Sequence, residues 1–258
     1  MGTARQVSGL PYGGSVESLP SLRMTANLNA LAHGMLDVPR AAAAVQGADV
    51  AHHVLDPESV LGLDPFTASD LTTALPALAG AGREGWVLGL PTPGSLLPLR
   101  GPRPLNEAAL QSGEVVLAAA GGVGLVPLPV GRAVQWRAYP AERPFAAASP
   151  YEAERALNEA VLGAAKALAR LDLAAGTRPP DEAGVRLAPG YSSRQVATAN
   201  RTLYLIAACD AALADDGASV SSYEADVRAR TLRAVRTAAS QALCTACSWL
   251  DVPARETR

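Results

Sequence analysis

The chain has 258 residues, of which 49% are hydrophobic and 18% are charged, and its formal net charge is -2. This length and hydrophobic content allow a sizeable buried core and exclude a disordered protein. The small net charge gives no global attraction for nucleic acid or for an anionic membrane, so we expect neither as a partner.

The hydrophobic residues are unusual in kind, because the chain contains 53 Ala and 34 Leu but a single Ile. The first residues lack the apolar segment of a signal peptide, and no run of about 18 apolar residues, the length that spans a membrane, is free of charge and proline. Three cysteines in a chain this long do not form a disulfide framework. We therefore expect a cytoplasmic protein without a membrane span.

The first third of the chain has the weakest patterns. Residues 1–20 contain four glycines and two prolines without apolar periodicity, which predicts a flexible N-terminal arm. Residues 21–83 predict a region of mixed short helices and loops. One short helix is expected over residues 40–46, and Ser69 is a candidate N-cap for another.

Residues 84–145 predict a β-rich region. Short apolar runs at 86–90 and 115–118 are bounded by turn residues, and residues 133–139 alternate between apolar and polar side chains. The glycines at 121–124 lead into Leu-Val-Pro-Leu-Pro, which cannot begin a helix, so they predict a hairpin turn and not a phosphate-binding loop. We expect a small antiparallel sheet or a partly open barrel.

Residues 149–252 predict a helical bundle. Three capping boxes begin at Ser149, Ser192 and Ser221, and each is followed by apolar residues three or four positions apart. The fold class is therefore α+β, with the sheet packed against a C-terminal three-helix bundle. Because alanine lets helix axes approach closely, the same faces also suit a second copy of the chain.

Cys244 and Cys247 form a CxxC motif near the end of the third predicted helix. A redox-active pair needs the helix N-terminus, where the dipole lowers the thiol pKa, and a structural zinc site needs a second ligand pair. Neither condition holds, so both cysteines are interpreted as small packing residues.

The adjacent His52 and His53 point in different directions on any regular element, so they do not share a metal, and a surface or loop location is expected. The chain has one lysine, Lys166, and no phosphate-loop motif. We predict no metal site and no cofactor.

Asp210 lies among alanines in an otherwise apolar helix. If that face is buried, the carboxylate needs a partner or its pKa rises. Arg201 and Arg233 are the candidate partners, which predicts a structural ion pair.

Arg230, Arg233 and Arg236 fall within a stripe about 120° wide on the third predicted helix. Asp226 precedes Arg230 by four residues, the order that favours a helical ion pair. Two interpretations stay open: a solvated helix face, or a binding surface for an acidic partner or a phosphate-bearing ligand.

Two functions remain. The first is a non-catalytic scaffold or regulatory protein that binds a protein partner or itself, favoured by the missing catalytic motifs and the alanine-rich helices. The alternative is an enzyme or small-ligand binder whose site lies between the sheet and the helical bundle. A deep, enclosed pocket with converging polar groups such as Asp210, Arg201 or His52 would favour the alternative, whereas a broad apolar or arginine-lined surface would favour the interaction protein.

Overall fold

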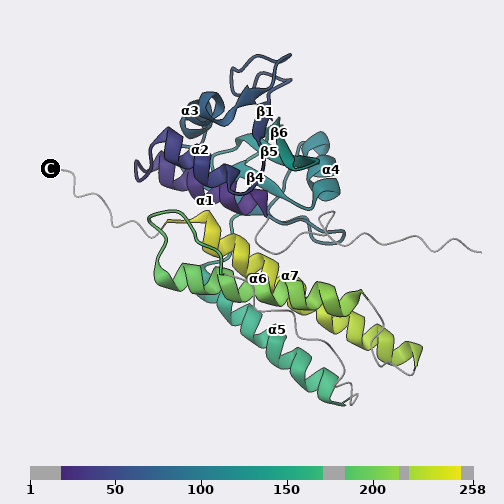
Figure 1. The fold of residues 1–258 in the computed structure, drawn as a ribbon. Helices are drawn as coiled ribbons and strands as arrows, with labels where there is room; N and C mark the ends of the chain where they lie inside the picture. Colours follow the sequence, from purple (N-terminus) through teal and green to yellow (C-terminus); the bar gives the residue numbers. More distant parts are fainter. Residues whose placement is uncertain (1–18, 171–183, 215–220, 251–258) are drawn as a thin grey trace, which may run out of the picture.

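The computed structural model describes residues 19–170, 184–214 and 221–250. A body of helices and strands is followed along the chain by three long helices, which lie beside it (Figure 1). The fold is α+β, as the sequence predicts. Of the expected N-terminal arm at 1–20, residues 1–18 lie outside the described residues, and Pro20 already belongs to the first helix.

The body is built on a six-stranded open sheet with strand order β2-β1-β6-β5-β4-β3. Its strands are β1 (His52–Leu55), β2 (Ser69–Asp70), β3 (Trp86–Gly89), β4 (Val115–Ala118), β5 (Gly122–Val130) and β6 (Ala133–Ala141). The pairs are antiparallel except β1 with β6, which is parallel, so the sheet is mixed where an antiparallel one was expected. It is not closed into a barrel.

Helices cover both faces of this sheet. On one face lie α1 (Pro20–Ala32), α2 (Val38–Gln46) and α3 (Leu71–Ala81), and on the other lies α4 (Arg103–Ser112). Successive residues of β4 therefore enter different cores: Val116 packs with the first three helices and Val115 with α4. This is why β4 is an unbroken apolar run.

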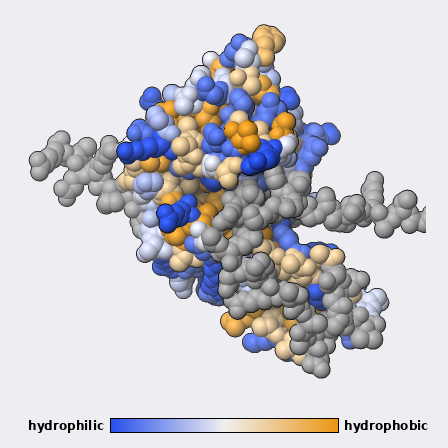
Figure 2. All heavy atoms as spheres, viewed as in Figure 1, coloured by the Kyte–Doolittle hydropathy of each residue, from blue (hydrophilic) through white to orange (hydrophobic). Residues whose placement is uncertain are grey.

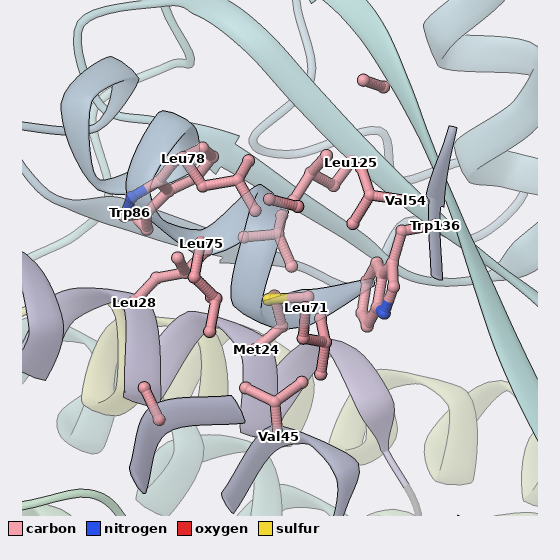
Figure 3. Close-up of a cluster of buried hydrophobic side chains, with 14 of the residues drawn as sticks. Met24, Leu28, Val45, Val54, Leu71, Leu75, Leu78, Trp86, Leu125 and Trp136 are labelled. Atoms are coloured by element: carbon pink, nitrogen blue, oxygen red, sulfur yellow. The ribbon is translucent and has the colours of Figure 1, made fainter. Parts of the chain in front are cut away.

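The larger core lies between the sheet and α1–α3. Figure 3 shows side chains from these elements pointing toward one another, with Trp86 and Trp136 at its two ends. Both indoles are fully buried. Asp37 and Asp70 cap α2 and α3 by accepting the backbone N–H of Arg40 and of Thr73, so Ser69, the expected cap, is one residue too early.

The three C-terminal helices are α5 (Pro150–Arg170), α6 (Ser193–Leu213) and α7 (Ser222–Ser248), and α7 packs against both others. The boxes at Ser192 and Ser221 are complete. Ser149 donates from its N–H and its hydroxyl to Glu152, at 2.9 and 2.7 Å. The expected helical starts are confirmed, and the shared core is largely alanine and leucine.

Three elements were missed by sequence reasoning. Strands β1 and β2 lie in the region 21–83, where short helices and loops were expected, and α4 lies inside the expected β-rich region 84–145. Within the described ranges, no helix is both long enough and apolar enough to cross a membrane.

Candidate binding pocket between the sheet and the C-terminal helices

The pocket lies beside the edge strand β3, whose outer edge is covered by side chains and not by another strand. The Asn29 amide accepts from Trp86 N–H at 2.7 Å and donates to Trp86 C=O at 3.1 Å, as a paired strand would. The Ser248 hydroxyl accepts from Leu88 N–H at 3.0 Å. An edge closed in this way is no longer a template for strand addition.

The same junction satisfies the last carbonyl groups of α7, which have no partner within the helix. The Tyr191 hydroxyl donates to Cys247 C=O at 2.5 Å, and burial raises the pKa of this phenol, so it remains protonated. The Gln195 amide donates to Ala246 C=O at 3.1 Å. The sheet and the C-terminal helices are thus held together by hydrogen bonds as well as by apolar packing.

A half-open pocket of about 110 Å³ lies next to this junction. Its walls come from three distant stretches of chain: β3 with the segment that follows it, residues 145–148, and one face of α7. The apolar lining is Val87, Leu88, Leu90, Leu97, Pro98, Phe145, Ala146, Ala147 and Ala148, and the polar lining is Thr92, Ser95, Arg236, Thr237, Ser240, Gln241, Cys244, Thr245 and Ser248.

Among these lining residues, the ionisable side chains are Arg236 and Cys244. Burial raises the pKa of the Cys244 thiol to about 12, and a hydrogen bond with the Leu90 backbone lowers it only in part, so the thiol stays protonated at neutral pH. The Arg236 guanidinium pairs with Asp210 on α6 at 2.5 and 3.3 Å. The pocket therefore offers hydroxyls, an amide and apolar surface, without a proton donor or acceptor that titrates near pH 7.

The mouth of the pocket is apolar, with an arginine lying against its aromatic ring. Leu97 and Phe145 are 52% and 47% exposed, and neighbouring Leu96 is 43% exposed. The Arg100 guanidinium carbon lies 5.0 Å from the Phe145 ring centre, within cation–π range. Glu142 and Arg143, shortly before Phe145 in the sequence, are both exposed, and no carboxylate among the described residues forms an ion pair with Arg100 or Arg143.

The structure separates the three arginines of the predicted stripe. Arg230 and Arg233 are exposed, and Arg230 donates to Asp226 C=O at 3.3 Å. Arg236 is half-buried and is neutralised by Asp210. The expected ion pair of Asp210 is present, but its partner is Arg236 and not Arg201 or Arg233.

The CxxC cysteines lie at the C-terminal end of α7, as predicted, and both are free thiols. Cys247 is fully buried and belongs to the core shared by the three helices. Burial raises its pKa well above the usual thiol value. Cys244 contributes to the pocket wall, a position that its spacing in the sequence did not reveal.

His52 is a buried core residue of β1, whereas a surface or loop position was expected. Its Nε2 lies 2.9 Å from an Asp49 oxygen, and its Nδ1 accepts from the Trp136 indole at 3.0 Å. Burial lowers the pKa of His52 despite the Asp49 carboxylate. His53 points to the opposite face and is exposed, as adjacent strand residues must be.

Glu114 is a second buried ionisable group that sequence reasoning missed. It accepts hydrogen bonds from Ser21 N–H, at 3.0 Å, and from the Ser21 hydroxyl at the start of α1, where Leu19 provides no side-chain cap. Burial raises the pKa of Glu114 to about 7, although the Ser21 hydrogen bonds and Arg23 act in the opposite direction.

Two protein-family models match the chain. The Rv1486c-like protein, N-terminal domain, matches residues 21–153, and the Rv1486c-like protein, C-terminal domain, matches residues 151–244. Neither a curated protein nor a solved structure matches the chain.

Proposed function

Because the chain belongs to the Rv1486c-like family, whose description states no activity, we propose a function from the pocket itself. The protein is a non-catalytic interaction protein, and the pocket between β3 and α7 receives a single apolar side chain of a protein partner. The observation that carries this proposal is the size of the pocket together with its chemistry.

The size favours one side chain over a metabolite. Small-molecule sites typically occupy about 300–1,000 Å³, whereas a cavity of about 150 Å³ holds a single benzene ring. The pocket, at about 110 Å³, is smaller than both, so it has room for no more than one side chain, part of which remains in its open mouth. Its half-open form gives room for the rest of the partner outside, against Leu97 and Phe145.

The chemistry favours binding over catalysis. General acid–base chemistry needs a group whose pKa lies near the working pH, and nucleophilic chemistry needs an activated group. The Cys244 thiol is protonated and Arg236 is held by Asp210. The remaining polar lining groups are hydroxyls and an amide, which orient a bound chain without reacting with it.

The distribution of hydrophobic residues on the surface favours binding through a few local apolar contacts. On the face that Figure 2 draws, hydrophobic and hydrophilic residues are interspersed over the body and do not form one continuous apolar face. An interface on such a surface depends on a few well-placed apolar contacts, which is the usual energetic pattern of protein recognition.

NMR titration of the full chain with N-acetyl-phenylalaninamide tests this function. We expect millimolar binding, with shifts concentrated at pocket residues such as Val87 and Thr245. Ser240→Leu, which fills the pocket from inside, and Ala147→Trp, which obstructs it from the exposed wall, should each weaken binding at least about tenfold.

Ser222→Leu is the matched control, because it makes the same change at an exposed position at the other end of α7. It should leave binding unchanged. Shifts outside the pocket, or equal binding by Ser240→Leu and the unaltered chain, would contradict the proposal. A metabolite that co-purifies and is displaced from the pocket would favour the small-ligand alternative instead.

A further inference from the structure

An ordered loop of the body presents an exposed aromatic side chain, the kind of group that the pocket is proposed to receive. The loop between β1 and β2, residues 56–68, is held by the buried carboxylate of Asp56, which accepts backbone N–H groups from Val60 at 2.8 Å, Leu61 at 2.9 Å and Leu63 at 3.1 Å. Val60, Leu61 and Leu63 also pack against the main core. The loop is therefore fixed in one conformation.

Phe66 projects from this loop with 93% of its surface exposed, more than any other large hydrophobic residue described. Its N–H is held by Asp64, at 2.9 Å. No packing within the described chain explains an aromatic ring in this position. A ring presented on an ordered loop loses little conformational entropy on docking, which favours its use as an anchor.

The charges of the loop and of the pocket mouth are complementary. Residues 56–70 carry four acidic side chains and no basic one. Of these, Glu58, Asp64 and Asp70 are exposed. At the pocket mouth Arg100 lies against Phe145, and the exposed Glu142 and Arg143 nearby in sequence have opposite charges, so the mouth is weakly positive and the loop is acidic.

The loop and the pocket cannot meet within one copy. The loop follows β1 near one edge of the sheet, and the pocket lies against β3 at the other edge. Four strand spacings separate β1 from β3, which is about 20 Å. Figure 1 shows the same separation, with the β1 end of the body away from the C-terminal helices.

We infer that Phe66 of one copy inserts into the pocket between β3 and α7 of the next copy. This inference rests on the proposed function and names its occupant: a second copy of this chain. Because the two surfaces differ, a single contact leaves an unused pocket on one copy and an unused loop on the other. These two surfaces either pair with each other, which closes a reciprocal dimer, or bind further copies, which gives a larger ring or an open chain.

Sedimentation velocity over a range of concentrations tests the contact. The unaltered chain should associate further as concentration rises, and less at high salt, since the inferred contact brings Arg100 to the acidic loop. Phe66→Ala and Ser240→Leu should each sediment as monomers. An equimolar mixture of the two variants should form a one-to-one dimer and nothing larger, because one intact loop meets one intact pocket.

Val130→Ala is the matched control, since Val130 is 58% exposed on the β5–β6 hairpin and should leave association unchanged. Ala147→Trp replaces Ser240→Leu if the latter lowers the melting temperature. A monomeric unaltered chain, or a Phe66→Ala variant that associates normally, overturns the inference. If N-acetyl-phenylalaninamide still binds the pocket in that case, the proposed function stands, and only the inferred identity of the group that fills the pocket is wrong.

Discussion

The α/β body and the C-terminal helices use different means to hold their structure. The body buries large side chains on both faces of its sheet, including Trp86, Trp136 and several leucines. The helices share one alanine-rich core, and the separate cluster around Ala164, Cys209 and Val235 is small. Since each buried alanine removes little apolar surface from water, the helices depend on their length and on the junction with β3.

The largest difference between the two regions should appear on deleting a leucine. Leu75→Ala empties a fully buried position in the body and should lower the free energy of unfolding by about 4 kcal/mol. Leu232→Ala, at a partly buried position beside the small helical cluster, should cost about 1 kcal/mol. Urea denaturation of both variants measures the two losses in free energy of unfolding, and equal losses would mean that the cluster beside Leu232 is packed as firmly as the body.

The junction should be the next most sensitive place. Asn29→Ala removes both hydrogen bonds to the Trp86 backbone and should cost about 3 kcal/mol, because two buried polar groups lose a partner. Asn29→Asp is the informative control, since its carboxylate still accepts from Trp86 N–H but cannot donate to Trp86 C=O. If the acceptor role of Asn29 dominates, thermal unfolding followed by tryptophan fluorescence should show a smaller loss of stability for Asn29→Asp than for Asn29→Ala.

Glu114 gives the body a pH dependence close to neutral pH. Its pKa is raised to about 7 in the folded chain, so the folded state binds the proton more tightly than the unfolded state does. Its contribution to stability is therefore fully present below about pH 4.5 and is lost as pH rises through 7, by at most about 3 kcal/mol. Glu114→Gln should remove this decline in urea titrations between pH 5 and pH 8.

His52 acts in the opposite direction. Its pKa is lowered in the folded chain, so protonation favours unfolding as the pH falls below about 6.5. In the Glu114→Gln variant, the free energy of unfolding should therefore rise with pH between pH 5 and pH 7. If the free energy of unfolding of Glu114→Gln does not change over this pH range, the pKa of His52 is not lowered in the folded chain.

The smallest losses of stability are expected for substitutions on the C-terminal helices. Asp210→Asn leaves Arg236 without its half-buried carboxylate partner and should cost about 1 kcal/mol. The double change Arg230→Glu with Arg233→Glu, on exposed positions, should leave the melting temperature nearly unchanged. If those arginines bind an acidic partner, the double variant loses that partner while Asp210→Asn keeps it.

The same contrast explains what could be read from the sequence. Local signals mark the helical region well, because a capping box such as Ser221–Glu224 depends on residues three apart. The body depends on distant pairings: His52–Leu55 is only four residues long, and it is a strand because it pairs with β6 across the chain. The two histidines that begin this strand do not predict that His52 is buried, because the fold alone brings its hydrogen-bond partners Trp136 and Asp49 to it.

The sequence allowed a site between the sheet and the helical bundle, but it could not place the residues of the pocket, for a similar reason. The side chains around the pocket come from residues 87–98, 145–148 and 236–248, and the CxxC motif within the last stretch gives no sign of a pocket. The expected ion pair of Asp210 required only burial of its helix face. Its partner, Arg236, depends on how α6 and α7 pack, which spacing along one helix cannot specify.

Photo-crosslinking from position 66 tests the proposed assembly most directly. p-Benzoylphenylalanine in place of Phe66 puts a reactive ring on the loop, and mass spectrometry locates the crosslinked peptides. We expect crosslinks between copies at residues 87–98, 145–148 and 236–248, and their loss in a partner copy that carries Ala147→Trp. Crosslinks confined to other surfaces, or none between copies at concentrations where the chain associates, would contradict head-to-tail assembly through this pocket.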